Sequence, residues 1–261
     1  MSIDSLTTIK LSLDKPINVT NNTIFVMDKY EYVSGGSGNW TNLAKLMSNN
    51  PKAKNLRDII IAKNPAEFVS GLSKETALLA KPIVKPMKLN AVQSKAIFKI
   101  LMAKHYALCL GMPGSGKTTL IVALVRLLVK MGKSVLLTAY THSAVDNVLV
   151  KLLKANQDQP CFLRLGRSTR VHEKIREFSE EYLIKAKNMT QVEDIDRLYQ
   201  SQPVIATTCL GANNHPAFVN RTFDYCIVDE AGQSLLLSAI GPLFHAEKFV
   251  LVGALSKREI Q

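Results

Sequence analysis

The sequence predicts an α/β domain with a doubly wound, mostly parallel sheet, preceded by a small domain of strands and helices. From residue 106 onward, short apolar runs recur, and stretches with helical periodicity separate most of them. Strands that are apolar throughout are typical of a parallel sheet covered by helices on both faces. Hydrophobic residues make up 47% of the 261 residues, which is enough for a sizeable core.

Residues 1–86 form the predicted small domain. Alternation at 8–13 and an apolar run at 23–27 predict strands, and the glycines of 35–38 predict a flexible turn or loop tip. Helical periodicity follows at 40–47 and 55–63. The two prolines of Lys81–Pro86 predict an extended linker, so we place the domain boundary there and assign 87–261 to the sheet domain.

The apolar runs of the second domain define its expected elements. Strands are predicted at 106–110, 134–139, 161–165, 204–208, 225–228 and 249–252. Residues 166–200 are highly charged and predict helices near 173–187 and 192–199, inserted between two strands. No apolar run reaches the roughly 18 residues of a membrane span. The 4 cysteines have no C-x-x-C spacing, which argues against zinc and iron–sulfur sites and favours small buried side chains.

The strongest motif is Gly111–Thr118, which matches the phosphate-binding pattern G-x-x-x-x-G-K-[S/T] and lies between a predicted strand and a predicted helix. Its backbone N–H groups and the helix N-terminus can cradle a polyphosphate. We expect Lys117 to reach the β- and γ-phosphates and Thr118 to bind Mg²⁺. The predicted nucleotide-binding residues are Gln93, Gly111, Pro113, Gly114, Ser115, Gly116, Lys117, Thr118 and Thr119.

A second acidic motif completes the predicted site. The apolar strand at 225–228 runs directly into Asp229 and Glu230. Asp229 can hold Mg²⁺ opposite Thr118, and Glu230 can orient and deprotonate the water that attacks the γ-phosphate. Lys117 and Glu230 are therefore the predicted catalytic residues of an ATP or GTP hydrolase.

Two further strand ends suggest contacts with nucleic acid. Backbone N–H groups and the Thr141 hydroxyl could hold a phosphate, although Ser143 and Asp146 also fit a purely structural capping box. Residues 204–211 repeat the arrangement of a strand followed by a hydroxyl-bearing turn. Gln93 can read an adenine edge, or it is a solvated side chain. The net charge of +12 favours a polyanionic partner.

Together these stretches resemble superfamily 1 helicases, and more closely the bifunctional DNA replication ATP-dependent helicase/nuclease family. The matching motifs are Gln93, Gly111–Thr118, Thr138–Asp146, Ala206–Gly211 and Asp229–Gln233. The resemblance implies a RecA-like P-loop NTPase domain that uses ATP and Mg²⁺ to move 5′ to 3′ on single-stranded DNA or DNA flaps. It further implies a role in Okazaki-fragment maturation and end resection, a nuclear and also mitochondrial location, and no membrane contact. It allows a single-strand-binding protein as partner, and it implies that Thr141, His142 and Thr208 contact the DNA backbone.

The sequence also departs from that family. After Gly253 the family continues with an aspartate and a Gln-Leu-Pro-Pro stretch, whereas this sequence reads Ala254–Gln261. Gly232 stands where a serine is expected. We expect the second motor domain and the nuclease module to lie outside these residues, so that the chain by itself binds ATP weakly and does not unwind DNA. Two alternatives stay open: part of an RNA-dependent superfamily 1 helicase, or a non-catalytic segment that binds nucleic acid or a partner.

Overall fold

The computed structural model describes residues 2–5, 8–10, 36–87, 89–155, 162–213 and 215–254. Its contacts divide the chain into two units, 1–34 and 35–261. In the first unit, β1 (Ser2–Ser5) and β2 (Thr8–Lys10) form an antiparallel pair. This pair confirms the start of the strand predicted at 8–13, whereas the run at 23–27 lies outside the described residues.

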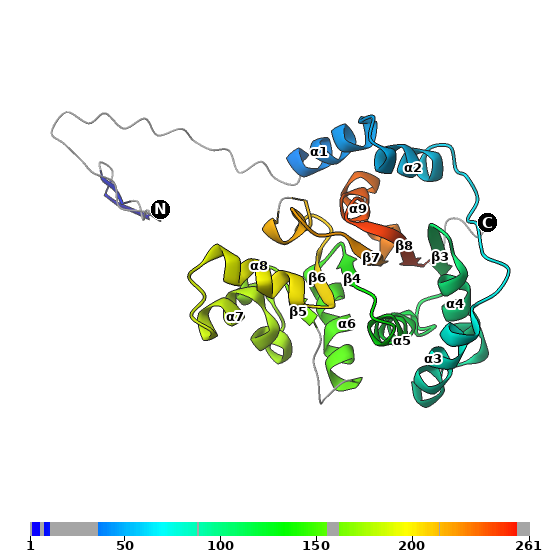
Figure 1. Ribbon diagram of the computed structural model, residues 1–261. Helices are drawn as coiled ribbons and strands as arrows, with labels where there is room; N and C mark the ends of the chain where they lie inside the picture. The colour runs from blue at the N-terminus through cyan, green and yellow to red at the C-terminus, as the bar shows by residue number, and fades with distance from the viewer. Residues whose placement is uncertain are drawn as a thin grey trace. The chain divides into compact units, whose positions relative to one another are not determined.

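Six parallel strands form the sheet of the second unit, in the order β3–β8–β7–β4–β6–β5 (Figure 1). All six predicted strands are confirmed, and with them the α/β fold class. The strand β8 lies between β3 and β7, so it separates the strand before Gly111 from the strand that ends at Asp229. The strands are β3 (Tyr106–Leu110), β4 (Val135–Ala139), β5 (Phe162–Arg164), β6 (Val204–Thr208), β7 (Phe223–Asp229) and β8 (Ala246–Gly253).

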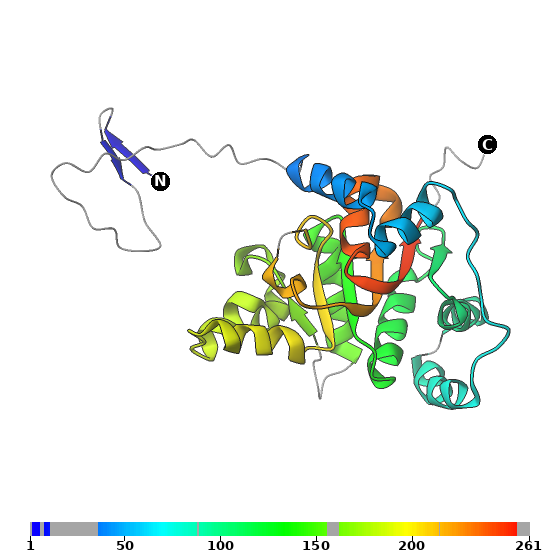
Figure 2. The same cartoon turned by 45° about the horizontal axis from the view of Figure 1, so that its top comes forward.

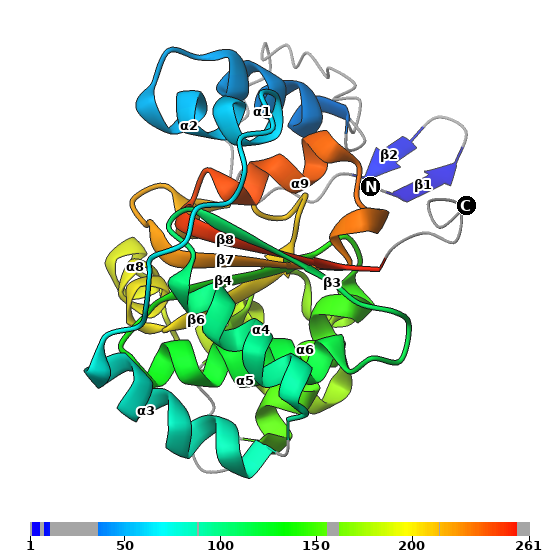
Figure 3. The same cartoon turned by 90° about the vertical axis from the view of Figure 1, so that its right-hand side faces the viewer.

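Helices cover both faces of this sheet (Figure 3). The pleat directs Val135 and Leu137 into one apolar cluster and Leu136 into the other, so both faces of β4 are buried. None of the described helices is both long and apolar enough to cross a membrane. One face carries α3 (Lys74–Val84), α4 (Ala91–Met102), α5 (Lys117–Lys130) and α6 (His142–Ala155), and the other carries α1 (Gly36–Met47), α2 (Pro51–Ile60), α8 (Val192–Ser201) and α9 (Leu236–Leu243).

The charged stretch between β5 and β6 is helical, as its sequence predicts, but the helix expected near 173–187 is divided at Ser179. It contains the 3₁₀ turns η2 (Ser168–Arg170) and η3 (Glu173–Phe178), followed by α7 (Glu180–Ala186) and then α8. Glu180 accepts a hydrogen bond from the Tyr199 hydroxyl and lies 3.0 Å from Nε2 of His215. The insertion is therefore tied to the loop that follows β6.

Two predictions about the segment before the sheet are wrong. Lys81–Pro86 is not extended, because α3 continues to Val84 and η1 (Lys85–Met87) follows it. Pro82 lies in the last turn of α3, where its fixed φ is compatible with a helix although it removes one i→i−4 hydrogen bond. Residues 36–38 are the first turn of α1 rather than a loop tip. The two units defined by contacts meet at residue 34, whereas the sequence predicts a domain boundary at 86. The assignment of 1–86 and 87–261 to separate functional domains stays a prediction.

Close packing explains two of the glycines in this region. Figure 2 shows α1 lying over α9, and the two helices are in contact. The Asn42 amide nitrogen donates to Oδ1 of Asn213 at 3.0 Å, inside the protein. A Cβ on Gly38 would lie 2.5 Å from Nδ2 of Asn213, and a Cβ on Gly241 would lie 2.2 Å from its Oδ1. Glycine is therefore required where the two helices approach each other.

Candidate nucleotide and nucleic-acid site

The phosphate-binding motif lies between the end of β3 and the start of α5, as its sequence predicts. Gly114 and Gly116 have φ angles of +77° and +83°, in the left-handed region that favours glycine. A Cβ on Gly116 would lie 2.5 Å from Nε2 of Gln93, and a Cβ on Gly111 would lie 2.7 Å from Oγ of Ser115. The backbone conformation thus favours glycine at 114 and 116, and a Cβ at 111 or 116 would displace a neighbouring side chain.

Lys117 folds back over the motif. Its ammonium group donates hydrogen bonds to the carbonyl oxygens of Gly111 at 2.9 Å and Met112 at 3.0 Å. Thr118 and Thr119 follow in the first turn of α5, where the helix macrodipole favours anions. The ammonium and the helix N-terminus therefore place positive charge at one point on the carboxyl edge of the sheet.

Gln93 joins α4 to the motif. Its side-chain oxygen accepts from the Asn90 N–H at 3.0 Å in a capping box, and its amide nitrogen donates to the Ser115 carbonyl at 3.1 Å. A cavity of about 530 Å³ extends between α4 and β3, next to the motif, and its walls include Val92 and Leu108. Its volume lies within the roughly 300–1,000 Å³ of ligand pockets. Gln93 therefore has a structural role in capping α4, and its predicted contact with adenine stays a prediction.

The acidic pair lies at the end of β7. Asp229 is 6% exposed, and its Oδ1 accepts the Glu230 N–H at 2.9 Å. Burial raises the pKa of Asp229, whereas the hydrogen bond from Glu230 and the positive charge of Lys117 lower it. This electrostatic effect links the two predicted halves of the site across β8.

Glu230 has a φ angle of +52°, which is uncommon for a residue with a side chain. Such a conformation costs about 1–3 kcal/mol and is found often at functional sites. Glu230 precedes η5 (Ala231–Gln233), which contacts β8. The strain falls on the residue that the sequence predicts to be the general base.

The side chains of Thr118 and Asp229 suit Mg²⁺, which takes most of its ligands from phosphate and water, better than a metal ion that only protein side chains coordinate. The described residues contain no group of three or more His, Cys, Asp or Glu side chains that could hold a metal ion. A P-loop Mg²⁺ needs one hydroxyl and one carboxylate, with phosphate and water oxygens as its other ligands. Thr118 and Asp229 are the residues that would hold it. Cys209 and Cys226 are buried free thiols, as the apolar runs around them predict.

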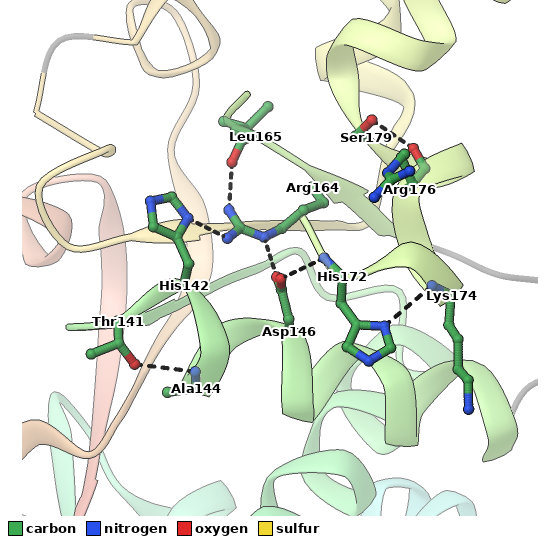
Figure 4. A network of polar contacts seen from close by, with 10 residues as sticks. All are labelled: Thr141, His142, Ala144, Asp146, Arg164, Leu165, His172, Lys174, Arg176 and Ser179. Carbon is green, nitrogen blue, oxygen red and sulfur yellow. Dashed lines mark hydrogen bonds and ion pairs between the residues drawn. The ribbon is translucent and has the colours of Figure 1, made fainter. Parts of the chain in front are cut away.

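A buried ionic network lies beside the predicted DNA-contact loops (Figure 4). Arg164, on β5, is 0% exposed, and its Nε lies 2.7 Å from Oδ1 of Asp146 on α6. Its Nη2 lies 2.9 Å from Nδ1 of His142, and Oδ2 of Asp146 accepts the His172 backbone N–H at 2.9 Å. The sequence analysis missed Arg164, although a charged residue within an apolar strand requires a buried partner.

The predicted DNA-contact residues gather at one edge of the sheet. Ala139 at the end of β4 pairs with both Thr208 and Asp229, so the loops after β4, β6 and β7 are neighbours. Thr141 accepts the Ala144 N–H at 3.2 Å and Thr208 accepts the Gly211 N–H at 3.1 Å, so both hydroxyls cap backbone turns. Their contacts with DNA stay predictions.

The alternative capping box of Ser143 and Asp146 is wrong. Thr141 provides the side-chain cap of α6, as its hydrogen bond to Ala144 shows. Asp146 instead pairs with Arg164, because the buried guanidinium needs a counter-charge more than the exposed helix end does.

The chain resembles a known domain family and several replication proteins. Residues 88–201 and 188–254 match the sequence model of the family described as "AAA domain". The DNA replication ATP-dependent helicase/nuclease DNA2 of Xenopus laevis is 46% identical over 239 residues, which cover 91% of this chain and 22% of that protein. Its Homo sapiens counterpart is 44% identical over 252 residues, 95% of this chain and 23% of that protein.

A plant relative has a similar sequence identity to this chain. The DNA replication ATP-dependent helicase/nuclease JHS1 of Arabidopsis thaliana is 46% identical over 227 residues, 86% of this chain and 16% of that protein. The chain thus spans about a fifth of the length of such relatives. Among solved structures, the UvsW helicase from Bacteriophage T4 matches with a TM-score of 0.47 and 15% identity, covering 75% of this chain and 64% of that one.

Proposed function

The chain belongs to the AAA domain family, and from that premise we propose that it forms part of the ATP-driven motor of a DNA replication helicase/nuclease. The observation that carries the proposal is that the motif Gly111–Thr118 and the acidic pair Asp229–Glu230 follow β3 and β7, the parallel strands on either side of β8, and so lie at the same carboxyl edge of the sheet. The identity to relatives with that name supports the substrate and the reaction.

In this proposal, Lys117 binds the β- and γ-phosphates after leaving its two carbonyl acceptors, and Thr118 and Asp229 hold Mg²⁺. The metal, when bound, neutralises charge on the phosphates. Glu230 orients the attacking water and accepts its proton. Gln93 and the cavity beside it receive the adenine. Each role requires only atoms that lie along the same edge of the sheet.

The same edge is proposed to bind single-stranded DNA through the loops that contain Thr141, His142 and Thr208. A net charge of +12 favours a polyanion at such a surface. The movement is proposed to run 5′ to 3′, and the whole protein to act in Okazaki-fragment maturation and end resection in the nucleus, and also in the mitochondrion. DNA flaps and a single-strand-binding protein are the proposed partners.

The test is nucleotide and DNA binding by purified residues 1–261. We expect Mg²⁺-dependent binding of a fluorescent ATP analogue that is lost in Lys117→Ala and retained in Lys130→Ala, which changes an exposed lysine at the other end of α5. Glu230→Gln should keep binding. Equal binding by wild type and Lys117→Ala would contradict the proposed nucleotide site.

The proposed binding of single-stranded DNA needs a separate measurement. Oligonucleotides of deoxythymidine and of uridine with equal length should be titrated with and without the ATP analogue. We expect the DNA oligonucleotide to bind, with an affinity that changes when nucleotide binds. Binding that prefers RNA would favour the RNA-dependent alternative, and binding that ignores nucleotide would favour the non-catalytic one.

A further inference from the structure

Arg164 constrains the protonation of His142. A guanidinium group has five N–H donors and no acceptor, so at 2.9 Å its Nη2 can only donate to Nδ1 of His142. A neutral imidazole that accepts at Nδ1 carries its proton on Nε2. The geometry in Figure 4 therefore selects one tautomer of the ring.

The charges around the ring oppose its ionisation. A protonated ring would place a second cation against a guanidinium that is buried. Burial and the charge of Arg164 lower the pKa of His142, Asp146 on α6 raises it, and Arg170 in η2 lowers it further. The ring is thus kept neutral as well as oriented.

The guanidinium itself is fixed on several sides. Asp146 binds its Nε at 2.7 Å, and the Leu165 carbonyl accepts from its Nη1. Asp146 is held in turn by the backbone N–H of His172 at 2.9 Å. Gly166 has a φ of +126°, and a Cβ there would meet Nη1 of Arg164 at 3.7 Å and Cε1 of His142 at 3.8 Å, so the chain turns closely around both groups.

We propose that Arg164 is a positioning residue that holds His142 as an uncharged hydrogen-bond donor, with its Nε2–H presented to a phosphate oxygen of single-stranded DNA. This inference rests on the proposed function, because it requires DNA at this edge of the sheet. It adds that a histidine, and not a cation, makes this contact. The insertion also takes part, since the His172 backbone supports Asp146.

An uncharged contact differs measurably from a cationic one. Each cationic phosphate contact on a single strand contributes about 0.7 to the slope of log K against log salt concentration, because it releases counterions. A neutral donor adds affinity and leaves that slope unchanged. Loss of His142 should therefore weaken binding without changing the salt dependence.

The first experiment measures the ring itself, without DNA. Long-range ¹⁵N–¹H spectra of ¹⁵N-labelled residues 1–261 should show neutral His142 with its proton on Nε2 at pH 8, and the ring should titrate at a lower pH than an ordinary histidine. In Arg164→Met/Asp146→Asn, which removes both buried charges together and so protects folding, the ring should titrate closer to an ordinary histidine. Comparison with His172→Ala assigns the signals of the neighbouring exposed histidine, and this variant should leave the His142 signals unchanged. A proton on Nδ1 in the wild type would overturn the inference.

The second experiment measures binding of a deoxythymidine oligonucleotide across a salt series at pH 7.5. His142→Ala should weaken binding about three- to tenfold, as expected for one lost hydrogen bond, with an unchanged slope. His172→Ala should match the wild type in both respects. A slope that falls by about 0.7 in His142→Ala would show a charged contact and contradict the inference. If the wild type does not bind the oligonucleotide at all, the proposed function fails together with the DNA contact, while the spectra still decide the tautomer.

Discussion

Gly116→Ala should impair nucleotide binding far more than folding. At a φ of +83°, an alanine costs about 1–2 kcal/mol relative to its ordinary conformation. Its Cβ would also lie 2.5 Å from Nε2 of Gln93, so that amide must leave the Ser115 carbonyl at a cost of about 1 kcal/mol. The free loop can relax to avoid this strain, whereas the proposed phosphate contacts require the conformation described here, so the sum of about 2–3 kcal/mol lowers nucleotide affinity by roughly 30- to 150-fold.

Two other glycines provide matched controls. Gly132, at the far end of α5, has a φ of +70°, and Gly114 has a φ of +77°; a Cβ added at either position would meet no atom within 4 Å. Gly132→Ala should lower the free energy of unfolding by about 1–2 kcal/mol and leave nucleotide affinity unchanged. Gly114→Ala should fall between the two in affinity. Denaturant unfolding and titration with a fluorescent ATP analogue give both quantities, and equal affinity losses in Gly116→Ala and Gly132→Ala would refute the reasoning.

Further substitutions test other contacts. Asp229→Asn should raise the free energy of unfolding at pH 7 and remove the Mg²⁺ dependence of ATP-analogue binding. Burial raises the pKa of Asp229, so the ionised carboxylate costs stability, and the difference from Asn should vanish in denaturant titrations below about pH 4. Asp146→Ala should lower the free energy of unfolding by about 3–5 kcal/mol because it leaves Arg164 buried and unpaired. A loss below about 1 kcal/mol, measured by denaturant unfolding, would show that the pair is solvated. Gly241→Ala should lower the free energy of unfolding by about 1–3 kcal/mol through overpacking. Gly232→Ser should change it by no more than about 0.5 kcal/mol, because its Cβ would meet only the Ala254 carbonyl, at 3.5 Å. Thermal unfolding of the two variants compares them directly.

The sheet and its phosphate-binding loop could be predicted because their signals are local. A strand such as β4 is apolar at every position, since both of its faces are covered, and the motif around Lys117 fixes its own backbone through glycine. The carboxyl ends of parallel strands lie along one edge, so the position of Asp229 at that edge followed from the predicted parallel sheet.

The rest depended on contacts between distant residues. Pro82 suggested a break in the chain, but packing of α3 against α5 keeps the helix continuous. Residues 36–38 suggested a loop because glycine disfavours helices, whereas contact with Asn213 requires a small residue there. Asp146 suggested a capping box three residues after Ser143, and only the fold brings it to Arg164. These errors share one cause, which is that tertiary packing outweighs local preference.

The hydrogen bonds of Lys117 to two carbonyl oxygens also bear on turnover. An ammonium group that already has acceptors exchanges them for phosphate oxygens, so its contribution to nucleotide affinity is a difference between two bound states. If the proposed function holds, the same exchange runs in reverse after hydrolysis, because the carbonyls of Gly111 and Met112 then compete with the product phosphates for the lysine. In the proposed motor, the loop would therefore lower the cost of product release, a step that limits the rate of many enzymes.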